Sequence, residues 1–416
     1  MTRRTGFTVL RKNQGGRVHI GVGSLEARIF SGRRDRPIDY AEKPATDESH
    51  RRPNSSWAAG LGCLERNFRL ACKMRLVLVA RFDETQVFVH VDNCHYLSHL
   101  GALDANNAYR LLRMTKTPMR GIIGPVVTAF HQNREIDFER SIAHSRWLLR
   151  HGCDGLVVFG TTSEANSLSL SERKRLLEAM ANSGISPADL VVGNGSCALP
   201  DAVDLANHAL QTGCCGVLML PPFYYKALSV DGLFAFFAEF IERVADPRLR
   251  VYLYHIPPVA QVGIAPELIE KLRTRYGRLV AGIKDSSGDW ENTRRLLIQF
   301  GDMKVFPGGE TFLLPALRLG AAGCISATAN VGAEAMQQLY QNWETAEAEE
   351  EQSKLIRVRK IFQRYPMIAA LKAVLATANN DENWRNVRPP LSPLTDLDSQ
   401  ALVRELGEAG FKPPKF

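Results

Sequence analysis

From residue 121 onward, short apolar runs alternate with amphipathic segments along the chain. The runs are continuously apolar, as in the strands of a parallel sheet covered by helices. There are eight of them: Gly121–Phe130, Gly155–Gly160, Leu190–Gly195, Gly216–Pro221, Val251–Pro257, Val280–Lys284, Val305–Gly309 and Gly323–Thr328. The segments between and after them have helical periodicity: Phe138–His151, Glu172–Ser183, Pro200–Thr212, Leu233–Val244, Pro266–Tyr276, Glu291–Phe300, Phe312–Leu319 and Ala333–Trp343.

This alternation predicts eight βα units and favours an α/β fold, a (β/α)8 TIM barrel over residues 119–345. A doubly wound open sheet is the alternative. It is disfavoured because no G-x-G-x-x-G follows the first strand, and Gly193-Asn-Gly195 lacks a third glycine. Three more helical patterns follow the last unit and predict a C-terminal helical appendage over residues 346–416: Glu349–Arg364, Met367–Thr377 and Ser399–Gly407.

Residues 1–118 show neither pattern. Residues 1–120 carry 21 Lys and Arg against 11 Asp and Glu, so the chain's net charge of +8 arises there. A basic nucleic-acid-binding arm is one interpretation, but aromatic and basic residues are not interleaved as such binding requires. We therefore expect a basic, disordered extension, or a start codon assigned too early, with Met119 or Met114 as the true start. Within it, Met74–Ala80 and Gln86–Val91 could form a hairpin.

The composition limits the remaining classes. Apolar content of 45% and charged content of 23% are ordinary for a globular protein. No apolar run reaches the roughly 18–20 residues of a membrane span, and the N-terminus lacks the apolar core of a secretory signal. The eight cysteines are scattered without a C-x-x-C pair or a Cys/His cluster. We expect reduced thiols, a cytoplasmic location and neither a metal nor a cofactor.

One lysine stands at a predicted strand end. In Val280–Gly288 an apolar run carries Lys284 at its end, directly before a Ser/Gly turn. The carboxyl ends of barrel strands share one face, where active sites are built. An amine taken into an apolar pocket there becomes a usable nucleophile, because burial disfavours its charged form. Other lysines fall in helical patterns and are expected on solvated faces: Lys174, Lys271, Lys354, Lys360 and Lys372.

The other strand ends carry hydroxyls and phenols. They include Thr128, Gly160–Glu164, Asn194–Ser196, Pro221–Tyr225, Tyr254–Pro257, Gly308–Glu310 and Ile325–Asn330. With an amine, this set suits Schiff-base chemistry, in which a phenol such as Tyr254 shuttles protons and a Thr-Thr turn binds a carboxylate. Taken singly, Tyr254 could be a core tyrosine, and Thr161 and Thr162 could be ordinary turn residues. His255 points opposite to Tyr254 along the strand, and we expect it to pack against helices.

Together these segments resemble the dihydrodipicolinate synthase / N-acetylneuraminate lyase family of pyruvate-dependent class I aldolases. The resemblance covers about residues 120–400 and none of the first 118. The matching segments are Gly160-Thr-Thr-Ser-Glu164, Pro222-Phe-Tyr-Tyr225, Tyr254-His-Ile-Pro257, Gly282-Ile-Lys-Asp-Ser-Ser287, Gly323-Cys-Ile-Ser-Ala-Thr-Ala-Asn330, Ala370-Leu-Lys372 and Arg388-Pro-Pro-Leu391.

The resemblance implies a role for each matching position. Lys284 forms the imine with pyruvate, and Tyr254 is the central proton carrier. Thr161 links it to a tyrosine inserted from a neighbouring subunit, Tyr225 or alternatively Tyr224. The family's usual assembly, a homotetramer built as a dimer of dimers, follows from this shared tyrosine.

The same resemblance assigns substrate binding to Thr161, Thr162 and the backbone of Ile325, around the pyruvate carboxylate and the imine. Two positions depart from the family pattern. Ser163 stands where glycine is usual. The arginine with which dihydrodipicolinate synthases bind the second substrate's carboxylate is absent, because Pro258-Val-Ala-Gln-Val262 contains none.

The sequence thus favours an enzyme that cleaves or condenses pyruvate with an aldehyde, on a sugar acid or a related 2-oxo acid. The first alternative is 4-hydroxy-tetrahydrodipicolinate synthase, with the carboxylate bound by another residue. The second is a non-catalytic oxo-acid-binding protein on the same fold. The joint presence of Lys284, Tyr254 and the Thr-Thr pair counts against the second. The partners expected are a small-molecule substrate and further copies of the chain, not a membrane or a nucleic acid.

Overall fold

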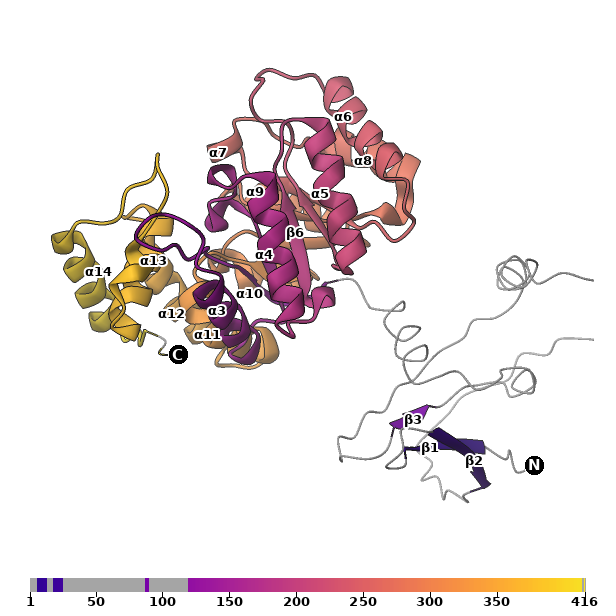
Figure 1. Cartoon of the computed structure of the whole chain (residues 1–416), viewed down its shortest axis with the longest axis horizontal. Coiled ribbons are helices and arrows are strands. Elements are labelled where there is room, and N and C mark those ends of the chain that lie inside the picture. Colours follow the sequence, from indigo (N-terminus) through magenta and orange to yellow (C-terminus); the bar gives the residue numbers. More distant parts are fainter. Residues whose placement is uncertain (1–5, 13–17, 25–86, 90–118, 414, 416) are drawn as a thin grey trace, which may run out of the picture. The chain divides into compact units, whose positions relative to one another are not determined.

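The computed structural model describes residues 6–12, 18–24, 87–89, 119–413 and 415 (Figure 1). The chain divides into two units, Met1–Lys116 and Thr117–Phe416. In the first, β1 (Gly6–Lys12) pairs antiparallel with β2 (Val18–Ser24) and with β3 (Val87–Val89). The expected partner of this last strand, 74–80, lies outside the described residues, and so does most of the predicted disordered extension. That expectation stays a prediction.

The second unit contains a sheet of eight parallel strands in the order β10-β9-β8-β7-β6-β5-β4-β11. The strands are β4 (Gly121–Pro125), β5 (Gly155–Val158), β6 (Leu190–Asn194), β7 (Gly216–Met219), β8 (Val251–His255), β9 (Val280–Asp285), β10 (Lys304–Pro307) and β11 (Gly323–Ile325). The first and last of these eight strands in chain order, β4 and β11, pair with each other, which curls the sheet round. Between β10 and β11 the backbone N–H of Ala322 donates to the carbonyl of Val305 at 2.9 Å. The predicted barrel is confirmed.

A helix follows each strand and covers the outside of the barrel (Figure 1). These helices are α3 (Phe138–Arg150), α4 (Leu170–Asn182), α5 (Leu199–Thr212), α6 (Val230–Val244), α8 (Pro266–Tyr276), α9 (Trp290–Gln299), α10 (Leu313–Arg318) and α11 (Ala329–Asn342). Their starts follow from local sequence. Ser169 and Glu172, for example, form a reciprocal capping box at the start of α4.

The first apolar run extends beyond the end of its strand. β4 ends at Pro125, yet the following residues up to Phe130 stay buried as a loop. Side chains from helices satisfy the loop backbone: Val127 N–H donates to Asn330, and Ala129 N–H donates to Ser141, each at 3.0 Å. A buried loop is tolerated here because its polar groups find partners.

Alternate strand residues point to opposite sides, and this parity decides which side chains reach the barrel interior. Tyr252, Tyr254 and Ile325 belong to the cluster of side chains that fills the interior. Lys284 lies opposite Tyr254 in the neighbouring strand. The next residue, Asp285, points outward and accepts a hydrogen bond from Thr293 of α9 at 2.7 Å.

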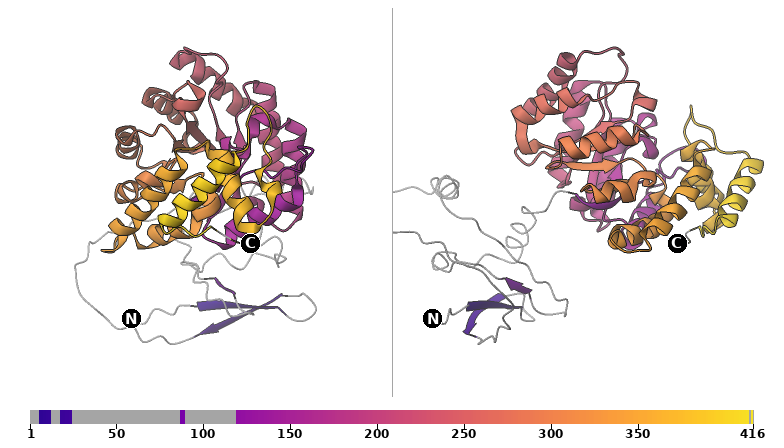
Figure 2. Two further views of the ribbon diagram at one scale, coloured as in Figure 1. Left: turned by 90° about the vertical axis from the view of Figure 1, so that its left-hand side faces the viewer. Right: turned by 180° about the vertical axis from the view of Figure 1, so that it is seen from behind.

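The C-terminal helices pack together on one side of the barrel, next to α11 (Figure 2). They are α12 (Ala348–Phe362), α13 (Met367–Asn379) and α14 (Asp396–Glu408), with the 3-10 turn η7 (Glu382–Arg385). Phe362, Trp384, Leu402 and Leu406 are buried in their shared core. The predicted C-terminal helical appendage is confirmed.

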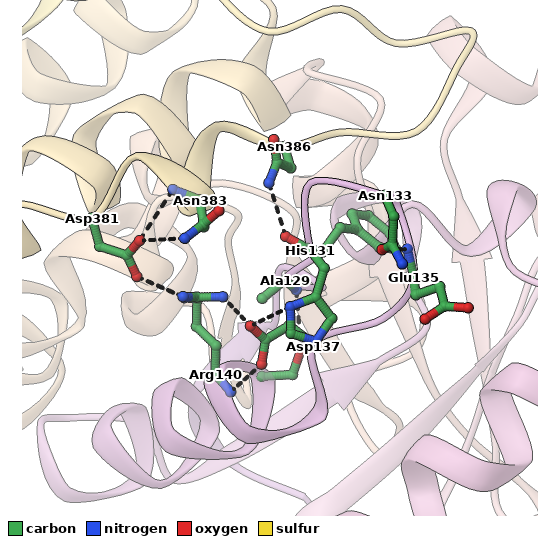
Figure 3. Close-up of polar contacts among 11 residues, drawn as sticks. Ala129, His131, Asn133, Glu135, Asp137, Arg140, Asp381, Asn383 and Asn386 are labelled. Atoms are coloured by element: carbon green, nitrogen blue, oxygen red, sulfur yellow. Dashed lines mark hydrogen bonds and ion pairs between the residues drawn. The ribbon is translucent and has the colours of Figure 1, made fainter.

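Polar contacts join this appendage to the loop after β4 (Figure 3). Arg140 of α3 binds Asp137, the residue that caps α3, and donates to Asp381 at 2.8 Å. The amide of Asn386 donates to the carbonyl of Phe130 at 3.1 Å. The appendage is therefore bound to the barrel by charge as well as by apolar packing.

The structure corrects one expectation for this region. Lys372 was expected on a solvated helix face, but its side chain is fully buried in α13. The helical pattern around it is misleading because α13 is apolar on nearly every face, so the buried face could not be read from periodicity.

Candidate active site

Lys284 lies inside the barrel at the carboxyl end of β9, where 5% of its surface is exposed. Its Nζ is 3.3 Å from the hydroxyl of Tyr254 on the adjacent β8. It also lies 4.4 Å from the centroid of the Tyr254 ring. The parallel register pairs the two residues directly, so the backbone places amine and phenol side by side.

Tyr254 continues this contact to a third residue. Its hydroxyl lies 3.4 Å from Oγ1 of Thr161, in the turn after β5. The tyrosine is 4% exposed, whereas Thr161 is exposed. Both distances are at the long end of hydrogen bonding, and such contacts commonly tighten when a substrate binds. The three side chains form a path from the buried amine toward the barrel mouth.

The turn after β5 is the 3-10 segment η2 (Thr161–Ser163). The first N–H groups of a helical turn have no partner within it, which leaves those of Thr161 and Thr162 available to a ligand. Ser163 is buried, and its hydroxyl donates to the carbonyl of Val126. In return Thr128 donates to the carbonyl of Ser163 at 2.8 Å. The two hydrogen bonds anchor the turn to the first strand's loop.

Glu164 ends this turn in the left-handed conformation, with φ of 57°, and its side chain is buried. Its carboxylate binds the ammonium group of Lys372 and accepts the backbone N–H of Arg388 at 2.9 Å. Burial lowers the pKa of Lys372 to about 8, and the Glu164 carboxylate opposes this shift. Lys372 of the appendage thereby supplies the positive charge that pairs with Glu164, next to Thr161 and Thr162.

Sequence reasoning noted Lys372 and Arg388 within late motifs, placed Lys372 on a solvated helix face and gave neither residue a role in the site. The guanidinium of Arg388 also binds Glu172 of α4 at 2.6 Å, and this contact lowers the pKa of Glu172 to about 2. Two cations from the appendage thus surround the segment that follows β5.

Comparisons with known proteins show the family to which this chain belongs. A family model described as "Dihydrodipicolinate synthetase family" matches residues 118–409. The chain belongs to this family. It is 34% identical over 290 residues to a protein of Chloroflexus aurantiacus described as an uncharacterized DapA-like lyase, covering 68% of this chain and 94% of the relative. The predicted family and the predicted lyase class are confirmed.

Two family members with assigned names are similar as well. The 4-hydroxy-tetrahydrodipicolinate synthase of Bacillus subtilis is 30% identical over 287 residues, covering 68% of this chain and 97% of that protein. The crystal structure of dihydrodipicolinate synthase from Agrobacterium tumefaciens superposes with a TM-score of 0.66 at 30% identity. It covers 70% of this chain and 99% of that chain.

Tyr224 and Tyr225 lie in the loop between β7 and α6, and the described part of this chain does not bring them to the Tyr254 hydroxyl. They are 75% and 68% exposed, with their rings edge to face at 5.4 Å. Together they place two large, exposed aromatic side chains next to each other, and exposed apolar surface of this kind is a feature of interaction sites.

The segment expected to carry a carboxylate-binding arginine forms the short helix α7 (Pro257–Ala260). Val259 is 63% exposed there and Ala260 is buried. A different cation is nearby: Lys226 donates to the carbonyl of Ala260 at 3.0 Å and to that of Phe223. Its hydrogen bonds are directed at backbone carbonyls.

The ends of β10 and β11 carry a further cluster, which sequence reasoning did not interpret. Glu310 is buried and accepts hydrogen bonds from the hydroxyls of Ser326 and Thr328. Arg359 of α12 lies 3.6 Å from the Glu310 carboxylate. Ile325, just before Ser326, faces the barrel interior and is fully buried.

The described residues contain neither a cluster of metal-binding side chains nor a membrane-spanning helix. No group of three His, Cys, Asp or Glu side chains among them is arranged to hold a metal ion. Likewise, none of the helices within the described ranges is long and apolar enough to cross a membrane.

Proposed function

We propose that this protein joins pyruvate to an aldehyde, or releases pyruvate from the product, through a Schiff base on Lys284. The observation that carries the proposal is the path from the Lys284 amine to Tyr254 and Thr161, with steps of 3.3 and 3.4 Å. A buried amine next to a phenol supplies both the nucleophile and the proton carrier that imine chemistry needs.

The reaction begins when the neutral amine of Lys284 attacks the ketone carbon of pyruvate, and water leaves after proton transfer. The iminium attracts electrons from the adjacent methyl carbon, which loses a proton to give an enamine. The enamine carbon attacks the aldehyde, a C–C bond forms, and the aldehyde oxygen takes up a proton. Water then hydrolyses the imine and frees the amine. Cleavage runs through the same steps in reverse.

Tyr254 moves these protons, because its hydroxyl contacts both the amine and Thr161. Thr161 relays them to Tyr225 of a neighbouring subunit, for which Tyr224 is the alternative. The exposure of both tyrosines favours an oligomer in which this loop is covered by another copy. A homotetramer built as a dimer of dimers meets this requirement.

The pyruvate carboxylate binds at the turn after β5. The N–H groups of Thr161 and Thr162 and their hydroxyls are the donors, and the backbone at Ile325 closes the opposite side of the imine. Backbone N–H groups at the start of a helical turn suit an anion.

For the second substrate we favour an aldehyde without a carboxylate at the position that the synthases' arginine would contact. Cleavage of a sugar acid or a related 2-oxo acid would release such an aldehyde. Val259 and Ala260 offer no charge to a carboxylate. The competing candidate is 4-hydroxy-tetrahydrodipicolinate synthase, with Lys226 as the cation. Similarity to the Bacillus subtilis synthase and the position of Lys226 beside α7 favour that candidate.

The test is reduction with borohydride in the presence of pyruvate, followed by peptide mass spectrometry. A reduced pyruvyl group on the peptide that contains Lys284 is expected. Lys284→Arg removes the labelling, because arginine does not give a neutral amine at working pH. Lys304→Arg is the matched control, and this variant should still be labelled at Lys284. Labelling at another lysine, or none at saturating pyruvate in a folded protein, contradicts the proposal.

A further inference from the structure

A cavity lies on the outer side of the barrel, away from the Lys284 amine. It measures about 370 Å3, is open to solvent and is lined by residues of α6, α8, α9 and the loops that precede α6 and α8. Much of its wall is apolar, with Leu228, Leu233, Ile264 and Leu268 among the lining residues. Small-molecule sites in proteins commonly have such volumes and such walls, with a few polar groups that orient the ligand.

His255 supplies one of those polar groups. Its Nδ1 accepts the backbone N–H of Ile264 at 2.9 Å, so a neutral ring carries its hydrogen on Nε2. Burial lowers the pKa of His255; Arg295 acts in the same direction and Asp285 opposes it. The ring that lines the cavity is therefore a neutral hydrogen-bond donor, fixed in one tautomer by the loop before α8.

Arg295 supplies a positive charge at the wall of the cavity. It lies on α9, is exposed, and donates to Oδ1 of Asn292 at 2.7 Å. Asn292 in turn donates to Oδ2 of Asp285 at 3.1 Å. Asn292 thus holds the guanidinium at the cavity wall, and most of the guanidinium's N–H donors remain for a ligand.

The acidic residues around the cavity are already paired. Asp285 accepts from Thr293 and from the Ser287 N–H as well as from Asn292. Asp231 of α6 and Glu267 of α8 both bind Lys271 on the surface. An anion in the cavity would therefore meet donors from His255 and Arg295 and no unpaired carboxylate.

We propose that this cavity binds a small monocarboxylate with an apolar body. The carboxylate accepts hydrogen bonds from the Arg295 guanidinium and from Nε2 of His255, and the hydrocarbon part contacts Leu228 and Leu233. Arginine suits this role because its planar fork matches a carboxylate. Binding here does not depend on the chemistry proposed for Lys284.

The experiment titrates 3-phenylpropanoate into the full-length protein by calorimetry, after the barrel site has been blocked with pyruvate and borohydride. Saturable binding is expected, and the uncharged 3-phenylpropanamide should bind about tenfold or more weakly. Arg295→Gln should weaken 3-phenylpropanoate binding about tenfold to a hundredfold, as for loss of a charge-assisted hydrogen bond. Arg294→Gln, which changes the neighbouring arginine outside the cavity, should leave binding unchanged.

A second variant tests the apolar wall. Leu228→Trp fills the cavity from a half-buried loop position and should abolish binding, while thermal unfolding verifies that the variant is folded. Absence of binding to the wild-type protein at millimolar concentrations overturns the proposal. Equal binding of acid and amide overturns it too, as does unchanged affinity in Arg295→Gln or in Leu228→Trp. Labelling of Lys284 tests the barrel site independently. If Lys284 were not labelled, the measurement of 3-phenylpropanoate binding would still test the outer cavity.

Discussion

Lys372 of α13 forms an ion pair with Glu164, and neither side chain is exposed to solvent. Glu164 directly follows the turn that carries Thr161 and Thr162. The C-terminal appendage therefore neutralises a buried charge beside the proposed pyruvate carboxylate site.

Replacing Lys372 with Met should destabilise the protein and weaken pyruvate binding. Removing one partner of a buried pair leaves an uncompensated charge, which costs about 3–5 kcal/mol. Urea unfolding measures the loss, and the KM for pyruvate should rise because the turn loses an anchor. Lys360→Met on the exposed face of α12 is the control. Adding Glu164→Gln to Lys372→Met should restore part of the stability. A single variant as stable as the wild type would show that the pair is dispensable.

Acid should destabilise the protein through His144 of α3. Burial lowers the pKa of this histidine to about 4, although its hydrogen bond to Asn330 at 3.0 Å opposes the shift. The folded state thus binds fewer protons than the unfolded state below pH 6.5, and stability falls as the pH drops toward 4. At pH 5 the loss relative to pH 8 should be about 2 kcal/mol.

His144→Gln tests this, because glutamine can still donate to Asn330 but does not titrate. Denaturant unfolding at pH 8 and pH 5 should show a smaller difference for the variant than for the wild type. His151→Gln, at the end of the same helix, should keep the wild-type difference. An unchanged pH dependence in His144→Gln would exclude His144 as the cause.

Tyr225→Phe should lower kcat about tenfold to a hundredfold, because a relay for proton transfer is lost. Borohydride trapping at Lys284 should still occur, only more slowly. Tyr224→Phe is the matched variant and should lose little. The reverse result would assign the shared tyrosine to Tyr224. Sedimentation of the wild type should give a tetramer, and a monomer with full activity would contradict a tyrosine shared between subunits.

Aspartate semialdehyde should be a poor acceptor. Loss of a charged partner for a desolvated carboxylate costs about 3–5 kcal/mol, or about two to three and a half orders of magnitude in kcat/KM. A condensation assay beside a dedicated synthase measures this, with a neutral aldehyde as the reference substrate. Val259→Arg should raise the rate with aspartate semialdehyde, and Lys226→Met should not change it. Efficient turnover that Lys226→Met abolishes would favour the synthase instead.

A chain that starts at Met119 should keep full activity and thermal stability. We expect residues 1–118 to contribute no packing to the barrel. Met119 itself is buried, and its backbone N–H donates to the Tyr252 hydroxyl at 3.2 Å, so the truncation must retain it. A fall in melting temperature or in kcat would mean that the preceding residues form part of the structure.

Much of the barrel could be predicted because its signals are local. Apolar runs, helical periodicity and turn residues placed the eight strands and the helices between them. The first strand was predicted too long, since the apolar loop up to Phe130 resembles a continuing strand until its partners, Asn330 and Ser141, are known. The order of strand ends then brought Lys284, Tyr254 and Thr161 together.

The contacts that were missed join residues far apart in the chain. Lys372 and Glu164 are 208 residues apart, and the periodicity around Lys372 does not identify which face of its helix is buried. The cluster of Glu310, Ser326 and Arg359 depends in the same way on how α12 packs. The late motif Ala370-Leu-Lys372 was the one available signal. The cavity beside His255 needs the packing of three helices, which periodicity does not supply.

The pairing of Glu164 with Lys372 and Arg388 has a consequence for synthesis on the ribosome. Glu164 is synthesised early, whereas its partners Lys372 and Arg388 follow 208 and 224 residues later. A nascent barrel would hold this carboxylate without its countercharge until nearly the whole chain has emerged. Chains that terminate before α13 should therefore be targets for proteolysis, and pyruvate should offer protection from degradation only to completed ones.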